Sequence, residues 1–175
     1  NQLSNYDIIM KVEAYQFVKD YLYKSINKER IYFYGAPGKF TDFEKIDAVD
    51  TKILKLLSKN ARCSIVDISH MLKIAPNTVK YRIKNYEKQK IILGYKPLIN
   101  INKLGVSSYI LFIKFEELNN SIEKRLIQYC KDTLNVTYLI KLLGQFHYHV
   151  EIETLSREAL QKIISDLRTI FKNNI

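Results

Sequence analysis

Basic side chains gather in one stretch of the sequence. Residues 73–103 hold eight lysines and arginines against the single acidic residue Glu87, while the 175-residue chain as a whole carries a net charge of +10. Each lysine that lies near a phosphate releases condensed counterions, so concentrated positive charge attracts polyanions. This stretch therefore favours contact with a nucleic acid over a solvated surface that is merely rich in lysine.

One helix predicted within this stretch has a face suited to that contact. Val79, Ile83 and Tyr86 fall within roughly 60° of one another at ~100° per residue, which predicts a helix over residues 76–89 with these side chains inward. The opposite face carries lysines that can bind phosphates, an amide that can read an adenine edge and a tyrosine that can contact backbone or base. We expect the contacts to come from Asn77, Thr78, Lys80, Tyr81 and Lys84, with Lys88 and Lys96 on flanking phosphates. Arg82 lies beside the inward face, and we interpret it as an ion-pair partner of Asp50 or Asp47 before a DNA contact.

Other groups capable of chemistry do not combine into a recognisable site. His147 and His149 share one face of a predicted strand, but the sequence offers no third ligand nearby, so we expect no metal and no cofactor. The run at 35–38 lacks the spacing and the lysine of a phosphate-binding loop. Cys63 and Cys130 are too few for a disulfide framework and fit a reducing cytoplasm. No apolar run approaches the roughly 18 residues of a membrane span.

The predicted contact helix is the third of a group. Helical periodicity predicts a helix over residues 47–59, and Ser64 is the expected N-cap of a second helix that ends near Leu72. The helix at 76–89 follows after a tight connection, and residues 91–99 read as two short strands about a turn. Three helices followed by a hairpin are typical of a winged helix-turn-helix.

The rest of the chain predicts an α+β sandwich. Strands are expected at 106–116, 136–143 and 146–153, with helices at 121–131 and after Ser156. The order β-α-β-β-α is a ferredoxin-like βαββαβ unit without its last strand. The chain stops at Ile175, where that strand should begin, and it opens at Asn1, so we expect a piece of a longer protein.

The N-terminus resembles part of that sandwich. Residues 6–13 align without gaps on residues 146–153, and a predicted helix at 17–26 and a strand at 30–34 follow. We therefore predict a partial β-α-β repeat at 1–41, a winged helix-turn-helix domain at 42–100 and a sandwich domain at 101–175.

The residues at 46–99 resemble the DNA-binding domain of the Lrp/AsnC (feast-famine) family of transcriptional regulators. The matching positions are Ile46-Asp47, Asp50, Ile53-Leu54, Leu57, Asn60-Ala61-Arg62, Ser64, Ile68, Leu72, Thr78-Val79, Arg82-Ile83, Ile91-Ile92 and Gly94-Tyr95. Residues 106–172 resemble the family's ligand-responsive sandwich, including a Gly144 turn before a strand. Lys90 stands where the family usually has glycine, and Tyr86 where it usually has leucine.

The resemblance implies a regulator, not an enzyme, that binds double-stranded DNA as a homodimer or higher oligomer formed through the sandwich. It also implies a small-molecule effector, such as an amino acid, bound near Gly144, Gln145, Phe146 and His147. Two alternatives stay open: an enzyme of the sirohaem-decarboxylase type on the same two-domain plan, and a DNA-architectural protein without strong sequence choice.

Overall fold

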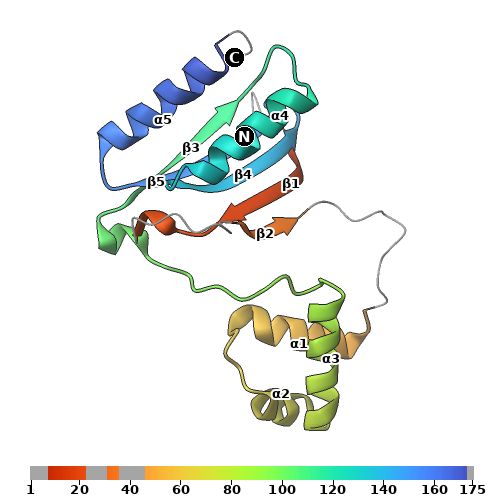
Figure 1. Cartoon of the computed structure of the whole chain (residues 1–175). Helices are drawn as coiled ribbons and strands as arrows, with labels where there is room; N and C mark the ends of the chain where they lie inside the picture. The colour runs from red at the N-terminus through yellow and green to blue at the C-terminus, as the bar shows by residue number, and fades with distance from the viewer. Residues whose placement is uncertain (1–7, 23–30, 36–45, 173–175) are drawn as a thin grey trace, which may run out of the picture. The chain divides into compact units, whose positions relative to one another are not determined.

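The computed structural model describes residues 8–22, 31–35 and 46–172. The chain divides into two compact units, of which one spans Gly38–Leu98 and the other joins Asn1–Pro37 to Ile99–Ile175. The first unit is helical, and the second is a sheet covered by helices (Figure 1). The observed α+β class and the two-domain plan confirm the predicted fold class.

The helical unit contains α1 (Ala48–Lys59), α2 (Ile65–Leu72) and α3 (Pro76–Lys88). Both of the first two helices begin at a capping side chain, because Asp47 and Ser64 accept hydrogen bonds from the free N–H groups of the first turn. Pro76 opens α3, where its missing N–H costs nothing. The three helices pack around one small core made of Ile53, Leu57, Ile68, Val79 and Tyr86.

The predicted wing strands are not formed. Residues 91–98 follow α3 as bends and irregular backbone, and residues 93–98 are exposed. A two-stranded ribbon is marginal without packing on one face, and Pro97 has no N–H to give to a ladder. The prediction of two short strands at 91–99 is therefore wrong, although the three preceding helices are as expected.

The second unit is built on one five-stranded antiparallel sheet in the order β2-β1-β4-β5-β3. The chain enters it through the short 3-10 helix η2 (Ile101–Leu104). The elements that follow are β3 (Ser107–Ile113), α4 (Asn120–Asp132), β4 (Val136–Leu143), β5 (Tyr148–Thr154) and α5 (Arg157–Ile170). Helices α4 and α5 cover the same face of the sheet (Figure 1). The main core lies beneath them and includes Leu126, Leu139, Val150 and Leu167. Through residue 172, no described strand follows α5, and β3 is an edge of the sheet.

The N-terminal segment belongs to this same sheet. It contains β1 (Met10–Phe17), the 3-10 helix η1 (Asp20–Leu22) and β2 (Ile31–Gly35). Strand β1 pairs with β4 in the register Met10 to Leu143 through Gln16 to Tyr138. A separate partial repeat at 1–41 was expected, whereas the described strands extend the sandwich of residues 101–172. The predicted helix at 17–26 is replaced by the end of β1 and by η1 as far as residue 22, and residues 23–26 lie outside the described part.

A buried carboxylate fastens η1 to the sheet. Glu153 on β5 is 6% exposed and accepts hydrogen bonds from the Lys19 ammonium and the Tyr21 hydroxyl. Burial and the hydrogen bond to Glu153 raise the pKa of Tyr21, so the phenol stays neutral. The three groups satisfy one another in a place where a lone charge would be costly. No local pattern predicts this cluster, because Glu153 lies more than 130 positions from both Lys19 and Tyr21.

Candidate nucleic-acid interface

Helix α3 turns the predicted contact residues to the outside. Its buried side chains, Val79 and Tyr86, pack on α1 and α2, and Ile83 is half-buried against the same core. The opposite face is exposed and carries Asn77, Thr78, Lys80, Tyr81, Lys84 and Lys88. Tyr81 is the most accessible of the aromatic side chains here, with 72% of its surface exposed. The side chains expected at a DNA surface therefore share one accessible face of one helix.

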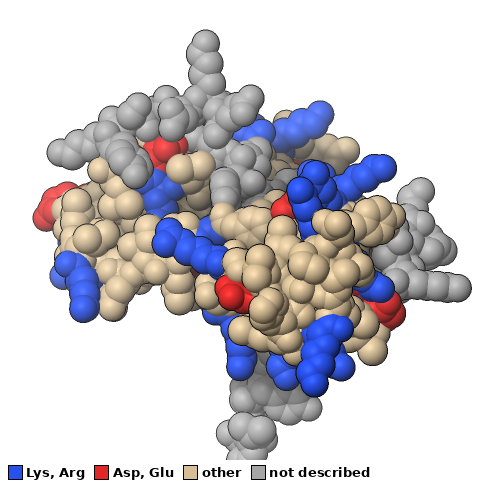
Figure 2. Space-filling view, turned by 90° about the horizontal axis from the view of Figure 1, so that it is seen from below, with Lys and Arg blue, Asp and Glu red and all other residues tan. Residues whose placement is uncertain are grey.

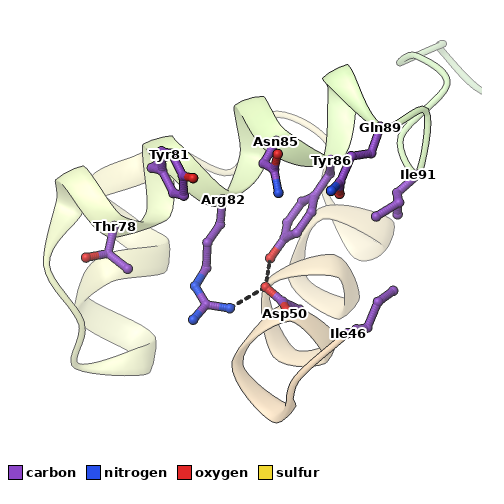
Figure 3. A pocket seen from close by; sticks show the side chains of 9 residues that line it. All are labelled: Ile46, Asp50, Thr78, Tyr81, Arg82, Asn85, Tyr86, Gln89 and Ile91. Atoms are coloured by element: carbon purple, nitrogen blue, oxygen red, sulfur yellow. Dashed lines mark hydrogen bonds and ion pairs between the residues drawn. The ribbon is translucent and has the colours of Figure 1, made fainter. Parts of the chain in front are cut away.

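An ion-pair cluster holds that helix to the start of α1. The Nη1 atom of Arg82 and the Tyr86 hydroxyl both donate to Asp50 (Figure 3). The same Nη1 atom also donates to Asp47, at 2.7 Å. Asp47 and Asp50 in turn accept each other's backbone N–H, at 2.7 and 2.9 Å, in a reciprocal helix cap. Arg82 therefore has the structural role that its position beside the inward face predicted.

The electrostatics of this cluster keep both carboxylates charged. Burial raises the pKa of Asp50, but the hydrogen bonds from Tyr86, the Asp47 backbone and Arg82 outweigh it and lower that pKa to about 2. The pKa of Asp47 is also lowered, chiefly by the hydrogen bond from the Asp50 backbone N–H and next by the hydrogen bond from Arg82. The same contacts raise the pKa of Arg82. Because the cluster holds two negative charges and one positive charge, its own charge does not attract a phosphate.

A shallow groove of about 370 Å³ lies between this cluster and the exposed face of α3. Thr78, Tyr81 and Asn85 line it from α3, Gln89 from the residue that caps α3, and Ile46 from the residues just before α1 (Figure 3). Its walls offer hydroxyl and amide groups next to the proposed contact residues. The groove therefore belongs to the border of that surface.

Basic side chains outnumber acidic ones in the stretch of sequence that contains α3, residues 73–103. On the face of the molecule that Figure 2 shows, Lys and Arg side chains project at many points and Asp and Glu side chains are fewer. Glu87, the one acid of residues 73–103, accepts a hydrogen bond of 3.1 Å from the Tyr95 hydroxyl, which ties the segment after α3 to the helix. Lys96 follows directly on this tether and is exposed.

The residues predicted to bind an effector lie in the β4–β5 connection. Gly144 has a φ angle of 148°, and a Cβ there would lie 3.3 Å from the backbone oxygen of Ile8, so a side chain would be strained as well as crowded. His147 accepts a 3.0 Å hydrogen bond from the Phe115 N–H at Nδ1 and stacks on the Phe115 ring. Phe146 packs against Phe112 with 5.1 Å between ring centroids. The structure thus gives these side chains internal contacts, and it brings them together on one turn with Gln145.

Groups that could hold a metal are absent from the part of the chain that the structure describes, where no three His, Cys, Asp or Glu side chains converge. Among the described helices, none has the length and apolar character needed to cross a membrane.

Comparison with known proteins supports the same assignment. Residues 46–92 match the family described as winged helix-turn-helix DNA-binding. The chain is 35% identical over 126 residues to the HTH-type transcriptional regulator Ptr1 of Methanocaldococcus jannaschii, with 67% of this chain and 82% of that protein covered. It is 28% identical over 123 residues to the transcriptional regulator LrpB of Bacillus subtilis, with 70% and 81% covered.

Solved structures have a similar fold. The structure of B. subtilis LrpC is similar with a TM-score of 0.59 and 26% identity, covering 70% of this chain and 86% of that one. The structure of Escherichia coli AsnC has a TM-score of 0.62 at 20% identity, covering 75% and 88%, and supports the fold.

The helical unit with its exposed basic helix and the α+β unit beside it in sequence define a two-domain DNA-binding transcriptional regulator. The relatives bear the names of transcriptional regulators, which favours this class over the enzyme alternative. The chain belongs to the Lrp/AsnC family.

Proposed function

We propose that the protein reads DNA sequence by inserting α3 into the major groove. The observation that carries this proposal is the exposed face of α3, where an amide, a phenol and lysines lie together while the opposite face packs in the core. Asn77 and Thr78 would meet base edges because they lie at the N-terminal end of the helix, as in other helix-turn-helix proteins. Lys80, Tyr81 and Lys84 would contact bases and the nearer phosphates.

Lys88 and Lys96 would bind the flanking phosphates. Both are exposed, and they lie on either side of the hydrogen bond between Tyr95 and Glu87. That bond ties Tyr95, and with it the segment that carries Lys96, to the residue of α3 that precedes Lys88. Burial is the largest cause of the raised pKa of Tyr95, followed by this hydrogen bond, so the phenol remains a donor at neutral pH.

The proposal extends to regulation by a small molecule. An amino acid would bind near Gly144, Gln145, Phe146 and His147, and a solved neighbour from Neisseria meningitidis, 19% identical with a TM-score of 0.63, is a complex with L-Met. The protein would act as a homodimer or larger assembly in the cytoplasm, with contacts formed through the sandwich. An effector can change DNA binding only if it binds two states of this assembly with different affinity.

The test is selection of sites from a pool of random-sequence duplexes at about 150 mM salt, where non-specific binding is weak. A sequence-reading dimer will enrich a two-fold symmetric site whose half-sites lie about one helical turn apart. Binding without enrichment, fading as the salt concentration rises, would identify the architectural alternative instead. Failure to bind duplex DNA even at low salt would refute the proposal.

The Lys84→Ala variant is expected to weaken binding to every sequence. Removing one phosphate contact should make the dependence of log affinity on log salt shallower by about 0.9. Asn77→Ala is the matched comparison, because loss of a base contact should cost about 1–3 kcal/mol at one base pair and relax the choice there. Both quantities follow from titrations of the selected site and its single-base variants over a range of salt. An unchanged slope would remove Lys84 from the interface.

A further inference from the structure

Two lysines outside the proposed contact set adopt a backbone conformation that L-residues avoid. Lys73 and Lys90 have φ angles of 54° and 60°, and they are the only non-glycine residues with positive φ in the described parts of the chain. This left-handed region brings Cβ close to the carbonyl oxygen, so that glycine is the usual residue there. A lysine at such a position lowers stability, and it is retained only where the surrounding structure enforces the conformation.

The end of α3 enforces the left-handed conformation at Lys90. The Lys90 N–H donates to the Glu87 carbonyl at 3.2 Å, and the Ile91 N–H donates to the Tyr86 carbonyl at 2.9 Å. This pair of hydrogen bonds is the Schellman motif, in which the residue just past the helix cap must be left-handed. Ile91 and Tyr86 also pack in the same core, which holds the motif closed. Glycine would make these same bonds without the steric cost.

The turn between α2 and α3 enforces the left-handed conformation at Lys73. The Lys73 N–H donates to the Ser69 carbonyl, and the buried Ser69 hydroxyl donates to the Ile74 carbonyl at 2.6 Å. The chain must reverse here within three residues to begin α3 at Pro76. Both left-handed positions are thus fixed by backbone hydrogen bonds, and neither depends on the lysine side chain.

The two lysines bracket α3 along the chain. Lys73 comes three residues before its first residue, and Lys90 comes two residues after its last. A helix of 13 residues is roughly 20 Å long at 1.5 Å per residue, whereas the major groove is about 12 Å wide. Side chains at the two ends of a helix in the groove would therefore reach the sugar-phosphate backbones that border it. Both lysines are exposed, and neither forms an ion pair with a described residue.

We propose that Lys73 and Lys90 are phosphate-binding residues that fix the two ends of α3 between the opposite DNA backbones, and that their left-handed backbones are the cost of this role. The inference rests on the proposed function, because it requires α3 to lie in the major groove. It assigns a purpose to lysine at two positions where glycine would form the same hydrogen bonds without the steric cost.

The experiment replaces each lysine by glycine in the full chain and measures thermal unfolding together with DNA affinity over a range of salt. Lys73→Gly and Lys90→Gly should each raise the unfolding midpoint of the helical unit by about 4 °C, since the steric cost disappears. Each should also make the salt dependence of DNA binding shallower by about 0.9. Higher stability combined with weaker DNA binding would show that the lysine contributes to DNA binding at the expense of the stability of the fold.

Three further variants separate charge from backbone effects. Lys90→Arg keeps the charge and should keep the salt dependence of DNA binding. Lys90→Asn tolerates the left-handed conformation but should make that dependence shallower by about 0.9, as Lys90→Gly does. Lys124→Ala removes an exposed lysine from α4 and should leave the slope unchanged. If wild-type protein binds DNA and both glycine variants keep its slope, this inference is overturned while the proposed function stands. A change at only one lysine overturns the two-ended arrangement, and wild-type protein that fails to bind DNA overturns both.

Discussion

Replacing Phe17 by alanine is expected to lower the free energy of unfolding of the sandwich by about 3–5 kcal/mol, the range for phenylalanine in a closed core. Phe17 is 2% exposed at the end of β1 and packs in the main core with residues of β4, β5 and both covering helices. Most of its core neighbours are far from Phe17 in the sequence. The loss of stability would therefore measure how much the packing of the N-terminal strand contributes to the sandwich. Chemical denaturation followed by circular dichroism gives the value.

The matched control is Met10→Ala in the same strand. Met10 is 51% exposed, and truncation of an exposed side chain should change stability by no more than about 0.5 kcal/mol. If Phe17→Ala were no more costly than Met10→Ala, β1 would not pack in the core in solution. The helical unit serves as an internal reference, since its own transition should not move.

Replacing Asp50 by alanine is expected to cost the helical unit about 2–3 kcal/mol. The side chain is a charged acceptor for Arg82, for the Tyr86 hydroxyl and for the Asp47 N–H, and hydrogen bonds to charged groups are worth about 1.5–3 kcal/mol. Truncation would also leave the buried Tyr86 hydroxyl without its acceptor. Calorimetric unfolding at neutral pH measures the loss, and Asp50→Asn shows how much of it is due to charge.

The contribution of Asp50 should depend on pH in a defined direction. Its pKa in the folded protein is lowered to about 2, below the ordinary value of 3.8. A carboxyl with a lowered pKa stabilises the fold fully above its unfolded pKa and loses that contribution as the pH falls through the folded pKa. The difference in stability between wild type and Asp50→Asn should therefore be constant above about pH 5 and shrink between about pH 4 and pH 2. A difference that stays constant down to pH 2 would contradict the assignment.

Local patterns predicted the helical unit well. The apolar spacing of Ile53, Leu57, Val79 and Tyr86 defined the inner faces of α1 and α3, and Ser64 marked the start of α2. Arg82 was predicted to pair with Asp50 or Asp47 because it falls beside the inward face, and it pairs with both. Such features depend on neighbours within a few helical turns or on a single helix-helix contact, so helical periodicity is enough to predict them.

The partner of the N-terminal strand could not be predicted in the same way. The likeness of residues 6–13 to residues 146–153 predicted a strand there, and the observed strand lies four residues later, at Met10–Phe17. That partner is β4, more than a hundred residues later, and no local pattern encodes the pairing of Ala14 with Ile140. The two wing strands were predicted wrongly for a different reason, because residues 93–98 have the composition of a strand but are exposed and pack on nothing that would hold a ribbon.

The pairing of β1 with β4 also has a consequence for folding of the chain while it is synthesised on the ribosome. Met10 lies opposite Leu143, so the closing strand is synthesised only after the whole helical unit has emerged. The helical unit is held by contacts close in sequence and can fold at once, whereas β1 must wait with its apolar side chains uncovered. A nascent chain stalled in this interval would hold a finished DNA-binding unit beside an unfinished sheet. That interval is when the protein would depend most on chaperones, and when slow translation would most favour aggregation.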